Sequence, residues 1–407
     1  MGQLVISRRH VLGLLGGTAL GFAVGCGSSV ESGNDDDAGG GEASGPITVG
    51  LLVPQSGVYA SLGTDMANAW NLWLDEHDGT LGGREVTTET ADEGETPDSG
   101  LAALQTLLQA DVDVLVGIVS SAVALGAADL VSEQQKLLIV SNAGAGDITG
   151  AARSPYIWRT SFTNAQVALP MGEHLAGQDE FKDGVFVIAA DYAAGNEAKA
   201  GFRSGFEANG GTVVDEAGTP FGTTQDFQPY LSQIQQSGAT ATFCFYAGAE
   251  AVNFVKQYDQ FGLADSIPLF GSGFLTEGGA LTAQGEAAMG VQTSLHYSTE
   301  LDNEANQAFV EAYQGAYDAA PTVYAVQTWD AALALDLAVA EAGDLSGDAL
   351  SEALGGLGEI SDSPRGPWSF DGQTPAQTFY LREVQSSDGT YVNAVLDELG
   401  EYAQPEA

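Results

Sequence analysis

The chain has 407 residues, of which 44% are hydrophobic, and its 55 acidic residues outnumber 12 lysines and arginines to give a formal net charge of −43. Such an acidic excess repels nucleic acids and anionic lipids, which excludes both as partners. It is typical of a protein that works in high salt, because screening relieves the self-repulsion of so many carboxylates in a compact state.

The N-terminal segment "SRRHVLGLLGGTALGFAVGC" has the three parts of an export signal. Its apolar run is shorter than the roughly 20 residues that a membrane-spanning helix needs. Arg8 and Arg9 resemble a twin-arginine export signal, and "AVGC" resembles a lipobox, in which Cys26 becomes the lipidated first residue of the mature chain. We therefore predict an export signal with a lipobox over residues 1–26. The alternative is a single-span anchor, and either one places the rest of the chain outside the cytoplasm.

The next stretch, residues 27–45, is dominated by Gly, Ser and acidic residues. It cannot bury enough apolar surface to offset its ordering entropy, so we predict a disordered tether. The folded part begins near Pro46, and its size suggests two domains. Cys244 lies in the apolar run "TATFCFYAG" and is expected to be a buried, unreactive thiol. The cysteines and histidines show no spacing typical of a disulfide framework or a metal site, so no cofactor or metal is expected.

Strand-like and helix-like runs alternate through the first two thirds of the folded part. The first series predicts strands at 47–54, 85–94, 112–120 and 137–144, and helices at 65–77, 98–111 and 121–136. The second series predicts strands at 183–192, 212–220, 241–248 and 267–274, and helices at 197–211, 226–238 and 249–262. The helix at 98–111 is expected to be capped by Asp98 or Ser99. Such alternation is typical of parallel sheets with helices on both faces, so each series is expected to form one lobe.

The last third departs from this alternation, with helices predicted at 304–321, 325–343 and 350–360 and a β-like segment at 366–385. The long helices would return the chain to the first lobe, which makes both lobes discontinuous. We therefore predict an α/β fold of two Rossmann-like lobes of parallel sheet, flanked by helices and joined by hinge strands. The N-terminal lobe would comprise residues 46–162 and 299–360, and the C-terminal lobe residues 163–298 and 361–403.

The junctions between strands and helices are the informative positions, because ligands of open parallel sheets bind at the carboxyl ends of the strands. They read "VPQSGVYASLG", "GIVSSAVALG", "SNAGAGD", "AADYAAGNEA", "FYAGAEA" and "GSGFLTEGG". They contain no phosphate-binding loop, dinucleotide fingerprint or nucleophile elbow. An exported hydrolase is disfavoured as well, because Ser120 has no histidine at a recognisable position to activate it. The pattern favours binding over catalysis, so the protein is not expected to be an enzyme.

The opening "ITVGLLVPQSGVYASLGTDMANAWNLWLDE" and the segment "VLVGIVSSAVALGAADLVSEQQKLLIVSNAG" resemble the Leu/Ile/Val-binding-protein family, the solute receptors of ABC importers with the type I periplasmic-binding-protein fold. "IWRTSFTNAQ", "AADYAAGNEA" and "VYAVQTWDAALAL" resemble further parts of that family in the same order. The resemblance implies a monomer that captures a small-molecule ligand between its lobes and delivers it to ABC permease subunits. Together with the lipobox, it places the protein on the extracellular face of the cytoplasmic membrane, held by a lipid anchor. The alternative is a surface ligand-sensing subunit of a signalling system, which uses the same fold.

The serine pair Ser120 and Ser121 stands where the family's hydroxyls and amides hold the ligand carboxylate. The helix expected to begin near Ser121 also offers unpaired N–H groups and a partial positive charge to an anion. The alternative is that the two serines only cap this helix, although a cap and an anion site can coincide.

The site for the α-ammonium is where the sequence departs from the amino-acid binders of the family. Ala143 and Ala145 stand near the family's hydroxyl position, and Gly273 stands near its acidic residue. Glu277 and Glu250 are possible substitutes, although each is expected at a solvated helix start. A buried ammonium without a carboxylate partner is costly, so the residues favour a carboxylate or amide ligand without an ammonium. The segments "GSGFLT" and "TSLHYS" also resemble the subgroup that takes up aromatic acids, so the ligand is expected to be an aromatic acid or an amino acid.

Aromatic and aliphatic side chains complete the candidate site. Tyr192 is expected to stack on the ligand or donate its hydroxyl, the alternative being a tyrosine on the lobe surface. Tyr59, Leu62 and Phe274 are candidates for the apolar wall of the pocket, the alternative being a place in the core. His296 is expected to be a hydrogen-bonded hinge residue near the crossovers between the lobes.

Overall fold

The structure is a computed structural model that describes residues 45–387 and 389–405. Arg8, Arg9 and Cys26 lie outside the described residues, as does the predicted tether up to residue 44. Across the described part of the chain, no helix combines the length and the apolar character that crossing a bilayer requires.

The first sheet has the strand order β2–β3–β1–β4–β5–β6. Its strands are β1 (Ile47–Val53), β2 (Thr80–Leu81), β3 (Arg84–Asp92), β4 (Val114–Gly117), β5 (Leu137–Val140) and β6 (Ile157–Arg159). Neighbouring strands are parallel except for the antiparallel pair β2–β3. Because helices cover both faces of a parallel sheet, β4 and β5 are buried along their whole length and read as continuous apolar runs.

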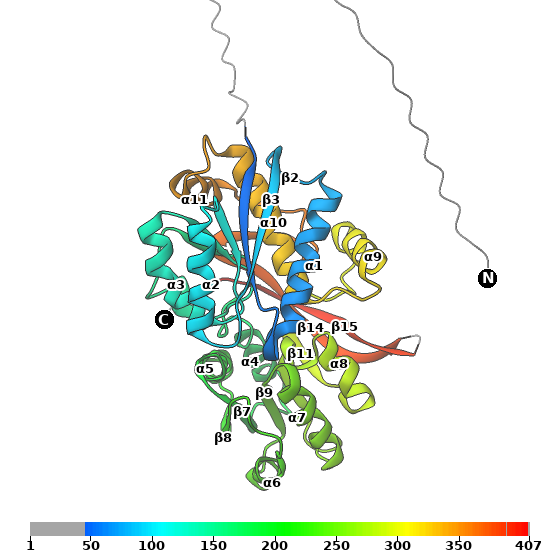
Figure 1. The fold of residues 1–407 in the computed structure, drawn as a ribbon. Helices are drawn as coiled ribbons and strands as arrows, with labels where there is room; N and C mark the ends of the chain where they lie inside the picture. The colour runs from blue at the N-terminus through cyan, green and yellow to red at the C-terminus, as the bar shows by residue number, and fades with distance from the viewer. Residues whose placement is uncertain (1–44, 388, 406–407) are drawn as a thin grey trace, which may run out of the picture. The chain divides into compact units, whose positions relative to one another are not determined.

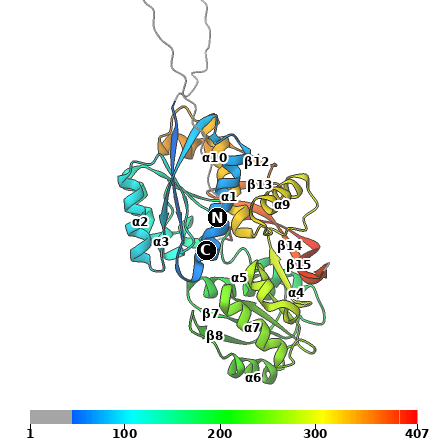
Figure 2. The ribbon, with the colours of Figure 1, turned by 45° about the vertical axis from the view of Figure 1, so that its right-hand side comes forward.

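Successive residues of β1 face two different helical layers (Figures 1 and 2). Leu51 packs in a core with α1 (Ala60–Glu76) and α10 (Val323–Glu341), whereas Leu52 packs with α2 (Pro97–Gln109) and α3 (Ser121–Gln134). The predicted cap of the helix at 98–111 was wrong by two or three positions. Thr96 caps α2, because its hydroxyl accepts the N–H of Ser99 and the Ser99 hydroxyl accepts the N–H of Thr96 in a capping box.

The second sheet has the order β12–β13–β14–β11–β10–β9–β7–β8, with β15 paired to β14. Its strands are β7 (Val185–Asp191), β8 (Val213–Pro220), β9 (Ala241–Phe245), β10 (Leu269–Ser272), β11 (Gln292–Leu295), β12 (Glu359–Ile360), β13 (Trp368–Asp371), β14 (Thr374–Ser387) and β15 (Thr390–Tyr402). Strands β7 to β11 are parallel to their neighbours within that group, and β12 to β15 pair antiparallel. The sheet is therefore mixed, with a parallel half and an antiparallel half.

Helices cover both faces of the parallel half as well. They are α4 (Leu169–Ala176), α5 (Ala193–Ala208), α6 (Gln228–Ser237), α7 (Gly248–Gln260) and α8 (Gly279–Gln284). Short 3-10 turns are η1 (Gly57–Tyr59), η2 (Gly146–Ile148), η3 (Gly273–Thr276) and η4 (Gly285–Ala288). Val187 of β7 shares a core with α4 and α5, whereas Ile188 shares a core with α6, α7 and α8. Cys244 of β9 is fully buried and free, as predicted, and burial raises the pKa of its thiol.

The chain returns to the first lobe through α9 (Glu304–Tyr317), α10 and α11 (Gly347–Gly356). Helix α10 lies along α1, and α11 packs on α10 and β5 (Figure 1). The predicted class, an α/β fold of two lobes with mostly parallel sheets flanked by helices, is therefore confirmed. We keep the residue ranges assigned to the two lobes as a proposal.

Three arginines are buried in the described part of the chain, Arg159 in β6, Arg382 in β14 and Arg365 just before β13. Arg365 pairs with Asp330 at 2.7 Å, and Arg382 pairs with Glu277 at 3.1 Å. Arg159 has no carboxylate partner among the residues that the structure describes and donates instead to the carbonyl of Phe162 at 2.7 Å. These contacts offset part of the cost of burying a guanidinium.

Candidate functional site

The carboxyl ends of β1, β4 and β5 meet at one edge of the first sheet, because these strands are parallel and in register. The chain leaves this edge through Tyr59, the serine pair and the loop of Ala143 and Ala145. In the second sheet, β7, β9 and β10 end just before Tyr192, Glu250 and Gly273. The topology therefore places the candidate residues at the strand ends, where ligands of open parallel sheets bind.

Ser120 and Ser121 occupy the start of α3. Ser120 is the N-cap residue, and its hydroxyl accepts the N–H of Val123 at 3.5 Å, so the predicted helix cap is present. The Ser121 hydroxyl accepts the N–H of Ala145 at 3.1 Å, which brings two of the candidate residues together. Both hydroxyls keep their own protons free for a further acceptor.

The backbone just before the serine pair is strained. Ile118 has a φ of 71°, a conformation that is rare for any residue with a Cβ and more so for a β-branched one. Its N–H donates to the carbonyl of Leu52 at 2.8 Å, and its own carbonyl accepts the N–H of Ala143 at 3.0 Å. Such strain costs on the order of 1–3 kcal/mol and persists where surrounding contacts enforce it, often at functional sites.

Glu93 is a residue of this site that the sequence reasoning missed. Its carboxylate accepts the N–H of Val119 at 2.8 Å and of Ser120 at 2.7 Å, and the side chain is 1% exposed. Burial raises its pKa to about 7, against the lowering effect of these two hydrogen bonds. The sequence did contain a signal for this residue, because Glu93 directly follows β3 and β3 pairs with β1 in the sheet. The N–H groups of Val119 and Ser120 are therefore already bonded to Glu93 and are not available to an anion. The donors that remain are the first-turn N–H groups of Ser121 and Ala122 and the two serine hydroxyls.

Arg159 stabilises the loop after β5 by hydrogen bonds to its backbone. This guanidinium donates to the carbonyl of Ala145 at 2.9 Å and to the hydroxyl of Thr149, and burial lowers its pKa to about 9. Ala143 and Ala145 are both buried, and neither offers a polar side chain. The structure therefore places both alanines beside the serine pair, whereas their role toward a ligand stays a prediction.

Gly273 lies where a side chain has no room. A Cβ at this position would overlap the Cβ of Leu295 and lie 2.6 Å from Nη2 of Arg382. The glycine carbonyl accepts from that same nitrogen at 3.0 Å. A side chain at this position would displace the buried Arg382, so position 273 is closed to an acidic residue in this chain.

Phe274 belongs to an aromatic cluster built from both lobes. Its ring centroid lies 4.7 Å from that of Phe162, 6.1 Å from Phe245 and 6.2 Å from Tyr324. Tyr324 is on α10, and Phe245 ends β9. These rings share one hydrophobic cluster, against which Tyr59, Leu62 and Tyr192 pack with partly buried side chains. Tyr59 and Tyr192 are also within electrostatic range of Tyr324, which stacks on Phe274.

Tyr192 is the N-cap residue of α5 and stacks on Phe221, with ring centroids 4.1 Å apart and planes 17° apart. Burial raises the pKa of Tyr192, and so does the proximity of Tyr59 and Glu250. Tyr192 is therefore not an isolated surface tyrosine. The phenols of Tyr59, from the first lobe, and Tyr192, from the second, lie within electrostatic range of each other.

The expectation that Glu277 lies at a solvated helix start is wrong. Its side chain is only 6% exposed. One carboxylate oxygen accepts the N–H of Val323 at the start of α10, at 2.8 Å, and the other lies 3.1 Å from Nη1 of Arg382. Glu250 does lie in the first turn of α7, but its side chain is half-buried. Of the two acids, only Glu250 has no cation partner in the described residues.

His296 is buried, with Nε2 3.1 Å from Nε2 of Gln327, and its ring centroid lies 6.1 Å from that of Phe162. Its pKa is lowered by burial and by the positive charges of Arg365 and Arg382. The hydrogen bond agrees with the expectation for His296, whereas its place at a hinge stays a prediction. Within the described residues, no group of three or more His, Cys, Asp or Glu side chains is placed to hold a metal ion.

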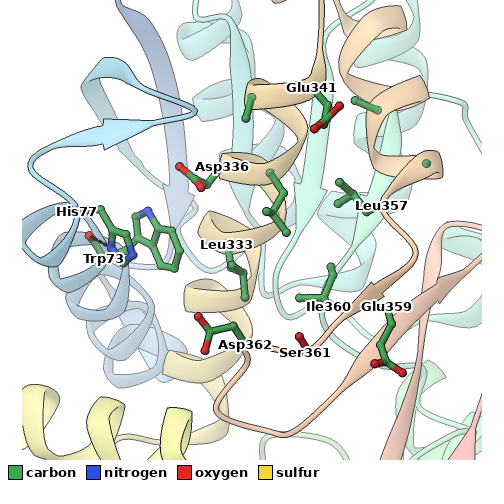
Figure 3. A pocket seen from close by; sticks show the side chains of 14 residues that line it. Trp73, His77, Leu333, Asp336, Glu341, Leu357, Glu359, Ile360, Ser361 and Asp362 are labelled. Carbon is green, nitrogen blue, oxygen red and sulfur yellow. Dashed lines mark hydrogen bonds between the residues drawn. The ribbon is translucent and has the colours of Figure 1, made fainter.

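A cavity of about 720 Å³ lies elsewhere, between α1, α10 and the segment that follows α11 (Figure 3). Its walls mix apolar side chains, among them Leu333, Leu357 and Ile360, with acidic ones, among them Asp336 and Asp362. It contains none of the strand-end residues described above. We place the candidate site at the strand ends and not here, because serine hydroxyls, aromatic rings and helix N–H groups of two lobes converge only there.

Comparisons with known proteins agree with this geometry. Residues 46–390 match the periplasmic binding protein family. The Leu/Ile/Val-binding protein homolog 6 of Brucella melitensis biotype 1 is 30% identical over 380 residues, which cover 88% of this chain and 93% of that protein. The solute-binding protein of an ABC transporter from Rhodopseudomonas palustris BisB5, in complex with 3,4-dihydroxybenzoic acid, is 33% identical, with a TM-score of 0.82 over 88% of this chain and 99% of its own. A solute-binding protein from R. palustris in complex with benzoate is 36% identical, with a TM-score of 0.78 over 86% and 96% of the two chains.

Proposed function

Because the chain belongs to the periplasmic binding protein family, we propose that its ligand is an aromatic carboxylate. Within that family it is a Leu/Ile/Val-binding-protein-like component of ABC transporters, which binds a solute and catalyses no reaction. The observation that carries the proposal is the closed position at Gly273, packed against Leu295 and Arg382. Glu277, the nearby acid, already binds Arg382 and the N–H of Val323. An α-ammonium would find no free carboxylate there, and leaving it unpaired would cost several kcal/mol.

The carboxylate of the ligand would bind at the start of α3. The Ser120 and Ser121 hydroxyls and the first-turn N–H groups of Ser121 and Ala122 are the available donors. The partial positive charge at the N-terminus of α3 favours an anion, and Glu93 keeps the preceding turn in place through its two backbone hydrogen bonds. Because Glu93 carries negative charge above its pKa, an anionic ligand is expected to bind better as the pH falls through about 7.

The aromatic ring would lie against the cluster of Phe162, Phe274 and Tyr324, with Tyr59 and Tyr192 closing over it. Aromatic pairs in offset or edge-to-face contact contribute about 0.5–1.5 kcal/mol each beyond the buried area. The two solved relatives described above bind 3,4-dihydroxybenzoic acid and benzoate. Their likeness at 33% and 36% identity supports the same ligand class in this chain.

We also propose that Cys26 carries a lipid and that the twin-arginine pair directs export, so that the receptor is a monomer tethered to the membrane beside its permease subunits. Stable anchoring of this kind needs more than one acyl chain. Radiolabelled fatty acid incorporated into the wild type but not into a Cys26→Ala variant supports this, and equal labelling of both refutes it.

The ligand proposal is tested by titration calorimetry in molar salt with benzoate, 4-hydroxybenzoate, leucine and a short amide. The protein is produced without residues 1–45, because residues 45–405 contain their own hydrophobic cores. We expect an aromatic acid to bind and leucine to give no heat, and a Ser121→Ala variant to bind the acid about tenfold more weakly through loss of one charge-assisted hydrogen bond. Tight binding of leucine contradicts the proposal.

A further inference from the structure

Glu250 lies between two of the loops that form the ligand site. It is in the first turn of α7, directly after β9, and β9 lies between β10 and β7 in the second sheet. The loop after β10 carries Phe274, and the loop after β7 carries Tyr192. The strand order therefore places a carboxylate among the aromatic side chains at the second lobe's edge of the site.

The Glu250 carboxylate is held by backbone donors and retains capacity for another. Its Oε1 accepts the N–H of Gly222 at 2.9 Å, and the backbone of Thr224 also favours its charged form. Gly222 follows Phe221, whose ring stacks on Tyr192, so the same short segment positions both the acid and the tyrosine. A carboxylate can accept about four hydrogen bonds, so these two leave room for a ligand donor.

Tyrosines from both lobes lie within electrostatic range of this carboxylate. Its negative charge contributes to raising the pKa of Tyr59 in the first lobe and of Tyr192 and Tyr246 in the second, in each case after burial itself. The charge of Glu93, which accepts the N–H of Ser120, also contributes to raising the pKa of Tyr59. Tyr59 is thus within electrostatic range of both Glu250 and the acid at the proposed carboxylate end of the site.

A negative charge in a site for an anion is unfavourable unless the ligand brings a donor to it. A half-buried carboxylate without a cation would repel plain benzoate, whereas a hydroxyl on the ring, remote from the carboxylate, would satisfy it with a charge-assisted hydrogen bond. Resting on the proposed function, we infer that Glu250 is a specificity-determining residue that accepts a hydrogen bond from a ring hydroxyl of the ligand, so that the site selects hydroxylated aromatic acids over unsubstituted ones.

The test is calorimetry with benzoate and 4-hydroxybenzoate on the wild type, Glu250→Gln and a matched control, Glu286→Gln. Glu286 is exposed and lies in η4, away from the strand ends. We expect the wild type and the control to prefer 4-hydroxybenzoate by about 10- to 100-fold, the range of a hydrogen bond to a charged group. In Glu250→Gln the preference should fall at least tenfold, mainly through weaker binding of 4-hydroxybenzoate, while benzoate binds as well as before or better.

A second variant keeps the test decisive if Glu250→Gln does not fold. Glu250→Asp retains the charge but shortens the side chain by one methylene. It should therefore weaken the binding of 4-hydroxybenzoate and leave the affinity for benzoate unchanged. Equal affinities of the wild type for the two acids overturn the inference and leave the proposed function standing. Leucine binding that depends on Glu250 overturns it as well, because the acid then serves an ammonium. Failure of both aromatic acids to bind overturns the proposed function itself.

Discussion

Removing the Glu277 carboxylate is the most informative perturbation of the fold around the site. Glu277 belongs to the second lobe, yet it accepts the N–H of Val323 at the start of α10, and it pairs with Arg382 in an environment almost free of solvent. A Glu277→Ala change leaves a buried guanidinium without its counter-charge, which typically costs about 3–5 kcal/mol. Arg382 keeps its hydrogen bonds to the carbonyls of Tyr297 and Gly273, so we expect a loss near 3 kcal/mol.

Differential scanning calorimetry in molar salt measures this loss. The unfolding entropy of a unit of this size is about 0.7–0.8 kcal/mol per kelvin, so the melting temperature should fall by about 4 °C. Glu286→Ala, at an exposed position in η4, is the matched control and should change it by less than 1 °C. Replacing both partners, as Glu277→Leu with Arg382→Met, should recover at least half of the loss, because an apolar pair needs no counter-charge. A Glu277→Ala variant as stable as the control would refute the reasoning.

Two further predictions concern charge and space at the strand ends. The pKa of Glu93 rises from 4.5 to about 7 on folding, so its contribution to stability is fully present below pH 4.5 and is lost as the pH rises to about 7, by about 3 kcal/mol. The melting temperature of a Glu93→Gln variant should accordingly depend less on pH across this window than that of the wild type, and parallel curves would show that Glu93 does not titrate as described. Gly273→Ala should lower the unfolding free energy by about 1–3 kcal/mol through overlap with Leu295 and Arg382, as measured by urea denaturation. Gly279→Ala, where the added carbon meets nothing within 4 Å, is its control, and equal stability of the two variants would mean that position 273 has room for a side chain.

Local patterns in the sequence were sufficient for the fold. The alternation of apolar runs and amphipathic stretches predicted both lobes. The spacing of apolar residues within a segment shows whether it is a strand or a helix and which of its faces is buried. The start of α3 at Ser121 followed from the same reasoning, since a helix cap is a contact between near neighbours.

Charged contacts across the chain could not be predicted in this way. Glu277 was expected in solvent because its partner Arg382 is 105 residues further along, and the N–H of Val323 is 46 residues away. Glu93 was missed because its two donors lie 26 and 27 residues away, on the strand-to-helix turn of a different βα unit. In both cases the backbone N–H that completes the site belongs to no recognisable motif, since every residue except proline carries one.

The three buried arginines have a consequence for how the protein responds to its medium. Of the 12 lysines and arginines in the sequence, Arg8 and Arg9 lie outside the described residues, which leaves ten. Arg159, Arg365 and Arg382 are buried, so seven remain for the rest of the described chain. Dissolved ions can enter the hydration layer of the carboxylate-rich exterior, but they cannot reach guanidinium groups enclosed in protein. Dilution of the medium is therefore expected to weaken the carboxylate-rich exterior, which depends on dissolved counter-ions, more than the contacts of the buried arginines. For two of these arginines the counter-ion is part of the polypeptide, Asp330 for Arg365 and Glu277 for Arg382.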